Sequence, residues 1–249
     1  MTLKPKKLRV AHAYELVSAE LEAQILDGTL RPGDQLPGEI DLAETFGVNR
    51  STIREGIRLL ESEGLVRRPS PRKLVVSLPR AKDLTSRHTR ALRMLDVSFL
   101  ELWHVALAIE PLSAELAARF AGPEALAALD DTQARLEQAT EAGKSQVAID
   151  TEFHDKVATA GNNRALQLAR EPIGFLLYSG MEVLAPRLPQ AADRQIVAHQ
   201  AIIAAIRARD PDTARTWMRR HIEDFKRGFE LAGLPLDAPI SACRTPAEA

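Results

Sequence analysis

The sequence predicts a mostly α-helical protein in two parts: an N-terminal winged helix-turn-helix and a C-terminal all-helical bundle of six or seven helices. Three observations support this prediction. Apolar residues recur at helical spacing along most of the 249 residues. Only the stretch near residues 65–77 alternates like short strands. The composition shifts near residue 78, and no strand pattern follows it.

The helices of the N-terminal part are marked by their ends. A first helix is expected over residues 10–27, and residues 36–65 then suggest a helix, a tight turn and a second helix. Gly47 suits the left-handed position that ends the first of these two helices, and Asn49 is a good N-cap for the second. Ile53, Ile57 and Leu60 would form the buried face of that second helix.

Two short helices joined by such a turn form a helix-turn-helix unit, which contacts bases with the N-terminal end of its second helix. The candidate DNA-contacting residues at this end are Asn49, Arg50, Ser51, Thr52 and Arg54. Guanidinium groups read guanine bidentately, while hydroxyl and helix-start N–H groups suit phosphate oxygens. The alternative is an ordinary helical pair with solvated arginines, because helical hairpins are common.

The flanking residues favour the DNA-binding interpretation. Two strands, Leu65–Arg68 and Leu74–Ser77, are expected to form a wing around a tip rich in Pro, Ser and basic residues. The wing carries the candidate DNA contacts Arg68, Arg72 and Lys73. Seven Lys and Arg residues stand against three acidic ones between residues 50 and 73, although the whole chain has a net charge of −1. The basic charge is therefore a local patch, as nucleic-acid contact requires.

Composition excludes several other classes of protein. No apolar run approaches the length of a membrane span, and the N-terminus lacks the apolar core of a signal peptide. A single cysteine, Cys243, allows no disulfide framework and no cysteine metal site. A pI near 6.6 argues against a general nucleic-acid coating protein. We expect a cytoplasmic protein without membrane contact.

The domain organisation follows from the same patterns. We expect the DNA-binding domain over residues 1–78, a linker and connecting helix over 79–97, and the helical domain over 98–232. The Pro- and Ala-rich residues 233–249 are expected to be disordered. Gly and Pro residues separate the expected helices of the second domain, which cover about 98–120, 123–142, 145–160, 163–185, 189–209 and 211–231.

The second domain contains a candidate metal site made of Asp150, His154, His199 and His221. Each of these residues lies within the apolar stripe of its helix when placed at 100° per residue. A lone inward histidine is more often a satisfied core residue than a ligand. A buried carboxylate and several imidazoles together need partners, and a divalent cation shared by three helices would meet that need. Zinc suits such ligands best, and nickel or manganese could also bind.

A candidate effector pocket is less well marked. Tyr178 and Ser179 could offer hydroxyl groups to a cavity, and His104 lies at the edge of its helix's apolar stripe. Packing or an interface is the default interpretation for such residues.

The N-terminal region resembles a known family. Residues 12–77, with GTLRPGDQLPGEIDLAETFGVNRSTIREGIRLLESEGLV, resemble the DNA-binding domain of GntR-type bacterial transcription regulators. The resemblance implies that Arg50 and Arg54 are the main DNA-reading residues. Ile40 stands where many relatives carry an Arg, and Pro71 stands where they carry a wing-tip Gly. These departures concern the operator sequence and the wing tip.

The second domain resembles the FadR-type C-terminal ligand domain of GntR regulators, called FCD. The similar segments are DTEFHDKVATAGNN, HQAIIAAIRARDPDTA and WMRRHIEDF. Many members bind a divalent metal through an Asp and three His, and this implies Asp150, His154, His199 and His221 as ligands here. Ala106 stands where an Arg commonly precedes the Glu110 position by four residues, so the effector or its binding mode is expected to differ.

The two parts together predict a ligand-responsive regulator, expected to be a repressor, that is not an enzyme. A homodimer would bind a palindromic operator in double-stranded DNA, and a small carboxylic acid would bind the metal. One alternative is a regulator for which the metal is itself the signal. The other is a metal-dependent hydrolase, which is disfavoured because no spare carboxylate clearly points into the apolar stripes as a general base.

Overall fold

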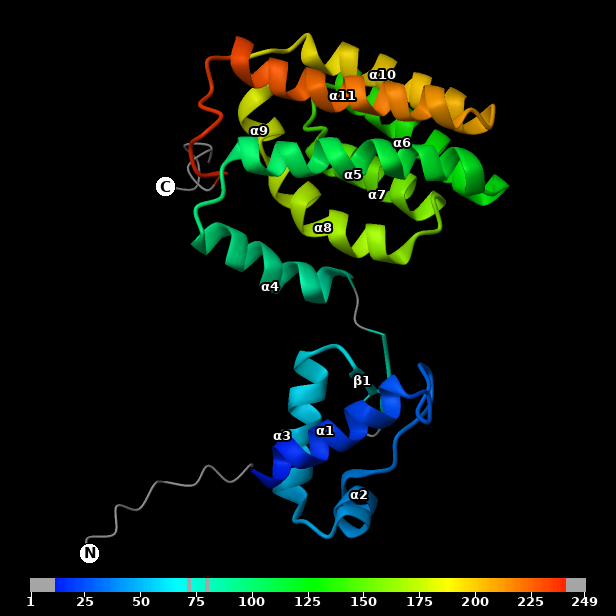
Figure 1. Ribbon diagram of the computed structural model, residues 1–249, viewed down its shortest axis with the longest axis vertical. Coiled ribbons are helices and arrows are strands. Elements are labelled where there is room, and N and C mark those ends of the chain that lie inside the picture. The colour runs from blue at the N-terminus through cyan, green and yellow to red at the C-terminus, as the bar shows by residue number, and fades with distance from the viewer. Residues whose placement is uncertain (1–11, 71–72, 79–80, 241–249) are drawn as a thin grey trace, which may run out of the picture. The chain divides into compact units, whose positions relative to one another are not determined.

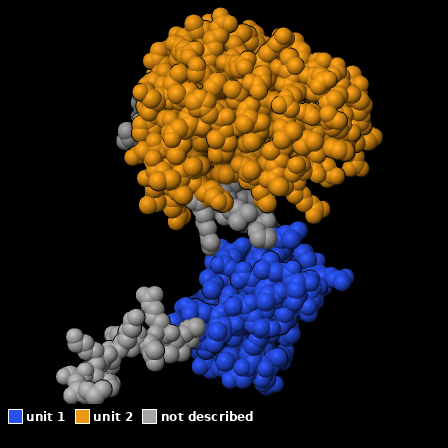
Figure 2. All heavy atoms as spheres, in the orientation of Figure 1, with its two compact units in different colours: residues 1–84 blue, residues 85–249 orange. Residues whose placement is uncertain are grey.

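The computed structural model describes residues 12–70, 73–78 and 81–240 (Figure 1). The chain divides into two compact units, residues 1–84 and 85–249, shown in separate colours in Figure 2. The division falls within helix α4 (Ala81–Met94), in the segment expected to form a connecting helix. None of the described helices is both long and apolar enough to cross a membrane.

The N-terminal unit is a winged helix-turn-helix, as predicted. Its elements are α1 (Ala13–Leu26), α2 (Glu39–Phe46), α3 (Arg50–Ser62), β1 (Val66–Ser70) and β2 (Lys73–Val76). Ile53, Ile57 and Leu60 of α3 are fully buried, in a core shared with α1 and both strands. The strands are antiparallel, and Gln35 pairs with Val75 beside them. Each strand lies one or two residues from its expected place.

Helix α3 begins and packs as its sequence dictates. Gly47 adopts the left-handed conformation (φ 65°) that ends α2. The Asn49 side chain accepts the backbone N–H of Thr52 at 2.8 Å and so caps α3. Where α3 meets α1, a Cβ added to Gly56 would lie 3.0 Å from the carbonyl oxygen of Tyr14. The close packing of α1 against α3 therefore fixes the position of α3 within the N-terminal unit.

The C-terminal unit is an all-helical bundle, as predicted. Its central helix α5 (Phe99–Phe120) packs against four other helices of the bundle, and α6 packs against α7 and α10 (Figure 1). The other helices are α6 (Pro123–Glu141), α7 (Val147–Ala160), α8 (Arg164–Ser179), α9 (Met181–Leu184), α10 (Ala191–Arg207) and α11 (Pro211–Leu231).

Two features of this unit differ from the expectation. The helix expected over 163–185 is two helices, α8 and α9, that meet at Gly180, where an added Cβ would lie 2.7 Å from the Phe229 ring. Residues 233–240, expected within a disordered tail, instead pack against the bundle. Ile240 is 6% exposed, and its N–H donates to the carbonyl oxygen of Val97 at 2.9 Å. Apolar residues of this segment make the packing favourable, and residues 241–249 lie outside the described chain.

Candidate nucleic-acid interface and metal centre

The start of α3 is held rigid by its own cap. Oδ1 of Asn49 accepts the hydroxyl groups of Ser51 at 2.6 Å and Thr52 at 2.9 Å, besides the N–H of Thr52. Asn49, Arg50, Ser51 and Arg54 are exposed, and Thr52 is half-buried. The structure therefore places the five candidate residues of this helix together at its exposed N-terminal end.

Glu39, at the start of α2, gathers the arginines of this surface. Its carboxylate oxygens lie 3.1 Å from Nη2 of Arg54, 3.4 Å from Nη2 of Arg68 and 3.7 Å from Nη2 of Arg50. Burial alone would raise the pKa of Glu39, but the hydrogen bond and the charges of these arginines lower it overall. Sequence reasoning missed Glu39, because its partners lie 11 to 29 residues further along the chain and share no local spacing with it.

The wing residues occupy different places. Arg68 points back toward the helices, since its Nε also lies 3.3 Å from Oε1 of Glu61. Lys73 is exposed at the start of β2, where it pairs with Ser70. Arg72 and Pro71 lie outside the described residues. Ile40 is 55% exposed beside Glu39, so the departure from the family pattern lies on this same surface.

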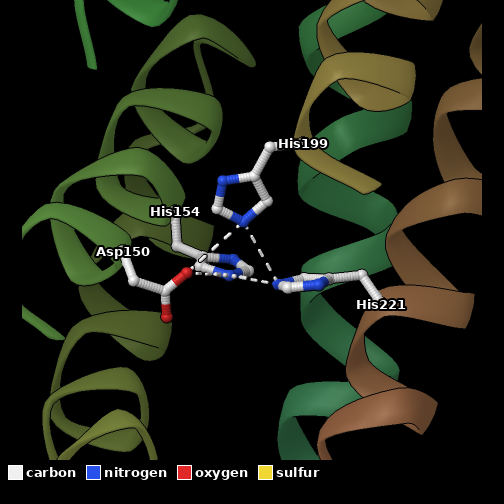
Figure 3. Close-up of side chains that lie close together, drawn as sticks. All are labelled: Asp150, His154, His199 and His221. Carbon is white, nitrogen blue, oxygen red and sulfur yellow. Dashed lines mark hydrogen bonds and ion pairs between the residues drawn. The ribbon is translucent and has the colours of Figure 1, made fainter. Parts of the chain in front are cut away.

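In the C-terminal unit, three helices bring four side chains to one point (Figure 3). Asp150 and His154 come from α7, His199 from α10 and His221 from α11. Nε2 of His221 lies 3.2 Å from Nε2 of His154 and 3.3 Å from Nε2 of His199. Oδ1 of Asp150 lies 3.3 Å from Nε2 of His199. We call these four residues the tetrad.

Three tetrad residues have pKa values shifted toward the forms that ligate a metal. Burial would raise the pKa of Asp150, but a hydrogen bond with His199 and the neighbouring imidazoles lower it well below its usual value. Burial lowers the pKa of His199 and, more strongly, that of His221. An ionised carboxylate and neutral imidazoles are the forms that bind a cation.

A second carboxylate, Glu110 of α5, supports the tetrad. Its Oε2 lies 3.0 Å from Nδ1 of His154, while its Oε1 accepts Nη1 of Arg170 and the hydroxyl of Tyr178, each at 3.0 Å. Burial would raise the pKa of Glu110, but the charges of Arg170 and His154 lower it to about 2. An ionised carboxylate accepts a hydrogen bond from Nδ1–H of His154, so Nε2 of that imidazole keeps its lone pair toward the tetrad.

Glu110 corrects the expectation that no further carboxylate lies at the site. Three donors occupy its oxygens, so it is not available as a general base. Arg170 was also missed, although its guanidinium is buried between Glu110 and Asp155. One sequence signal was open to use: both are charged residues inside apolar stretches of their helices, where an unpaired charge would be costly.

The tetrad fits a divalent cation on the chemistry of its donors. Four ligand atoms lie within 4.8 Å of one another. The contacts of 3.2 and 3.3 Å between imidazole nitrogens match the separation of about 3.3 Å expected for tetrahedral zinc ligands bound at 2.0–2.1 Å. Nδ1 of His199 and Oε1 of Gln195 are buried without a hydrogen-bond partner among the described residues. The cluster could therefore hold a metal ion.

A cavity of about 30 Å³ adjoins the tetrad and is lined by Asp150, Tyr178, Gln195, His221 and Asp224, among other residues. Tyr178 stacks on His154 with ring centroids 4.4 Å apart. Burial raises its pKa, so its hydroxyl remains a donor to Glu110. Ser179 is directed elsewhere, because its hydroxyl donates to the carbonyl of Leu176 at 2.6 Å. His104 is exposed beside Trp103, and neither it nor Ser179 lines this cavity.

Both units match described families. Residues 13–75 match "Bacterial regulatory proteins, gntR family", and residues 101–224 match the "FCD domain". The chain is 31% identical over 209 residues to the "Uncharacterized HTH-type transcriptional regulator Rv0494" of Mycobacterium tuberculosis, covering 84% of this chain and 86% of that protein. The chain belongs to the GntR family of bacterial transcription regulators.

Other GntR regulators agree with this assignment. The Glc operon transcriptional activator of Escherichia coli is 26% identical over 234 residues, covering 88% of this chain and 91% of that one. The solved structure of Streptococcus agalactiae GntR has a TM-score of 0.63 at 26% identity, covering 86% and 99% of the two chains. This GntR regulator is therefore a DNA-binding transcription regulator with an FCD domain, and its family is not a family of enzymes. The tetrad lies wholly within the FCD match.

Proposed function

We propose that this regulator reads a palindromic operator as a homodimer, with Arg50 and Arg54 as the main base-contacting residues. Their support is the exposed position of both guanidinium groups at the capped start of α3. Asn49, Ser51 and Thr52, with Arg68, Arg72 and Lys73 of the wing, would contact phosphates and fix the register. One short recognition helix reads few bases, so two-fold symmetry would supply the second half-site. We propose repression, since a bound dimer can block a promoter without contacting polymerase.

The tetrad is proposed to hold a divalent metal ion, with zinc favoured over nickel or manganese. The observation that carries this proposal is the convergence of three imidazole Nε2 atoms and one carboxylate oxygen within 4.8 Å. A bound cation would supply a Lewis-acidic centre that accepts oxygen ligands. Glu110 would fix the tautomer of His154, and the stacked Phe153 ring, 3.7 Å from the His199 ring, would fix that imidazole.

The effector is proposed to be a small carboxylic acid that binds at the metal-loaded tetrad. Its oxygens suit a cation held by imidazole and carboxylate ligands. The adjoining cavity is lined by Gln195, whose amide NH₂ donates to Oδ1 of Asp150. Binding would change the domain arrangement and so the spacing of the two DNA readers. A coupling of about 1–3 kcal/mol would change operator affinity about 5- to 150-fold.

A gel shift with DNA from upstream of the protein's own gene tests the DNA-binding half. Arg54→Ala should weaken binding, while Arg58→Ala on the same helix serves as the control, because Arg58 pairs with Glu55 away from the proposed contact. Equal binding by wild type and Arg54→Ala would defeat the recognition-helix assignment.

Elemental analysis of protein purified without chelators tests the metal half. The double variant His199→Ala/His221→Ala should lose the metal, while His104→Ala, which removes an exposed imidazole, should keep it. Equal metal content in wild type and the double variant would remove the proposed site. If operator affinity followed the metal concentration with no organic acid added, the metal would itself be the signal and the effector proposal would fail.

A further inference from the structure

Arg194, on the first turn of α10, has a hydrogen-bond donor without a partner next to the tetrad. Its Nε donates to Oδ2 of Asp224 at 2.8 Å, and its Nη1 donates to the carbonyl oxygen of Gln190 at 3.4 Å. Nη2 is buried, and no acceptor among the described residues reaches it. A buried guanidinium N–H without an acceptor is costly, while the Arg194 side chain as a whole is 38% exposed and within reach of a ligand.

Asp224 pairs with Arg194 and lies close to the tetrad residue His221 on α11. It follows His221 by three residues on α11, so the two side chains share one face of the helix, with Cβ atoms about 5–6 Å apart. Both residues line the 30 Å³ cavity, and both also line a groove of about 400 Å³ between α10 and α11, together with Arg194, Trp217 and Arg220. The side chains of His221 and Asp224 therefore border both spaces.

The small cavity cannot hold an organic acid by itself, since 30 Å³ is room for one or two water molecules. An acid bound at the tetrad must extend into a neighbouring space. A hollow of about 590 Å³ shares only Met181 and Ala191 with the cavity, and its charged lining residues, Lys144 and Glu182, are both exposed to solvent. The groove between α10 and α11 shares His221 of the tetrad and Asp224 with the cavity, and it is also lined by Arg194, so it suits a charged group better.

Another buried guanidinium near the tetrad is unavailable for an acid group. The guanidinium of Arg170 is occupied by Glu110 and Asp155. Arg220 also lines the groove, but its guanidinium lies over the Trp217 ring, and of these two arginines it is Arg194 that has a buried N–H without an acceptor among the described residues.

We propose that Arg194 is the acid-recognising residue of the effector site and that the effector is a small dicarboxylate. One acid group would reach the tetrad, and the second would take Nε and Nη2 of Arg194 in place of Asp224, in the bidentate pairing that carboxylates form with arginine. The short separation of His221 and Asp224 suits a spacer of two or three carbons. This inference rests on the proposed function, because it takes the metal-loaded tetrad as the first contact.

Isothermal titration calorimetry on the zinc-loaded, full-length protein tests the proposal with succinate and butyrate. Both have four carbons, and they differ in the second acid group. Succinate should bind wild type at least about tenfold more tightly than butyrate, as expected for a charged hydrogen-bonded pair. Arg194→Ala should reduce succinate affinity to that of butyrate. Asp224→Asn should raise succinate affinity, because it removes the carboxylate that competes for Arg194.

Arg207→Ala is the matched control, since Arg207 lies on the same helix and pairs with exposed Asp130. It should leave both affinities unchanged. A succinate preference that survives Arg194→Ala, with zinc content unaltered, would overturn the proposal. Equal affinities of wild type for the two acids, together with operator release by both, would defeat the role of Arg194 and leave the proposed function standing. A zinc-loaded wild type that binds neither acid would also overturn this inference, while the metal and DNA-binding proposals would still be decided by their own experiments.

Discussion

Glu110→Gln would test how Glu110 orients His154 while leaving all four tetrad residues unchanged. The glutamine oxygen would face the donors of Arg170 and Tyr178, so the amide NH₂ would face Nδ1 of His154. Because that nitrogen must then accept, the imidazole proton would move to Nε2, the atom that faces the rest of the tetrad. We therefore expect a change of tautomer that opposes metal binding, with the four ligands still present.

The size of the effect follows from the burial of Glu110. A pKa lowered from 4.5 to about 2 corresponds to about 3 kcal/mol favouring the ionised carboxylate. Removing one partner of a buried ion pair costs about 3–5 kcal/mol of unfolding free energy. Glu110→Gln should cost near the lower end of this range, because the glutamine oxygen keeps the hydrogen bonds from Arg170 and Tyr178. Zinc affinity should fall about 10- to 100-fold, as for other carboxylates that orient a metal-bound histidine.

Competition with a coloured chelator would measure zinc affinity, urea unfolding would measure stability, and ¹⁵N NMR would report the tautomer of His154. Glu115→Gln is the control, because Glu115 lies on the same helix and pairs with Arg119 and Arg215 at the surface. Unchanged zinc affinity in Glu110→Gln alongside a loss of stability would refute the orienting role and leave only a structural one. A proton that stays on Nδ1 would refute the tautomer argument directly.

Three further predictions concern the DNA-binding surface, the helix cap and pH. Glu39→Gln should raise affinity for a scrambled duplex and so reduce the ratio of operator to scrambled affinity, because three arginines lose their shared counter-charge. Glu55→Gln should change neither affinity. Fluorescence anisotropy would measure both duplexes, and an unchanged ratio in Glu39→Gln would contradict the prediction. Asn49→Ala should lower the unfolding free energy by about 1 kcal/mol in urea, and no loss would mean that the cap is replaceable. The folded protein lowers the pKa values of His199 and His221, so below pH 6.5 these imidazoles take up protons more readily in the unfolded chain. The metal-free protein should therefore be most stable above pH 6.5 and lose stability as the pH falls below it. A urea midpoint that stayed constant from pH 7.5 to 5.5 would contradict this prediction.

Local patterns were enough to predict most of the fold. Gly47 and Asn49 mark the turn of the helix-turn-helix through backbone conformation and capping, which act within a few residues. The tetrad residues could be selected because each one interrupts an apolar stripe on its own helix. That they converge depends on how α7, α10 and α11 pack, and the expectation of one shared site came from the need of buried polar groups for partners.

Residues whose roles depend on distant partners could not be predicted in this way. Glu110 and Arg170 are 60 residues apart, and no helical spacing connects α5 with α8. Arg68 was assigned to the wing from its position in the strand pattern, yet its guanidinium lies against Glu39 of α2 and Glu61 of α3. The order of residues 233–240 escaped prediction because their composition resembles a tail, while their contacts are made with residues near 97–100.

Gly174 has no side chain, and this absence allows two residues of α8 to bond to Glu110. Arg170 and Tyr178 lie one turn before and one turn after it, and both bond to the same oxygen. A methyl group at position 174 would sit 2.9 Å from Nη1 of Arg170 and 3.2 Å from the tyrosine ring. Even alanine, the residue that helices ordinarily favour, would push the side chains of Arg170 and Tyr178 apart. One added carbon on α8, a helix that contributes no tetrad residue, would thus disturb Glu110 and, through it, the imidazole of His154.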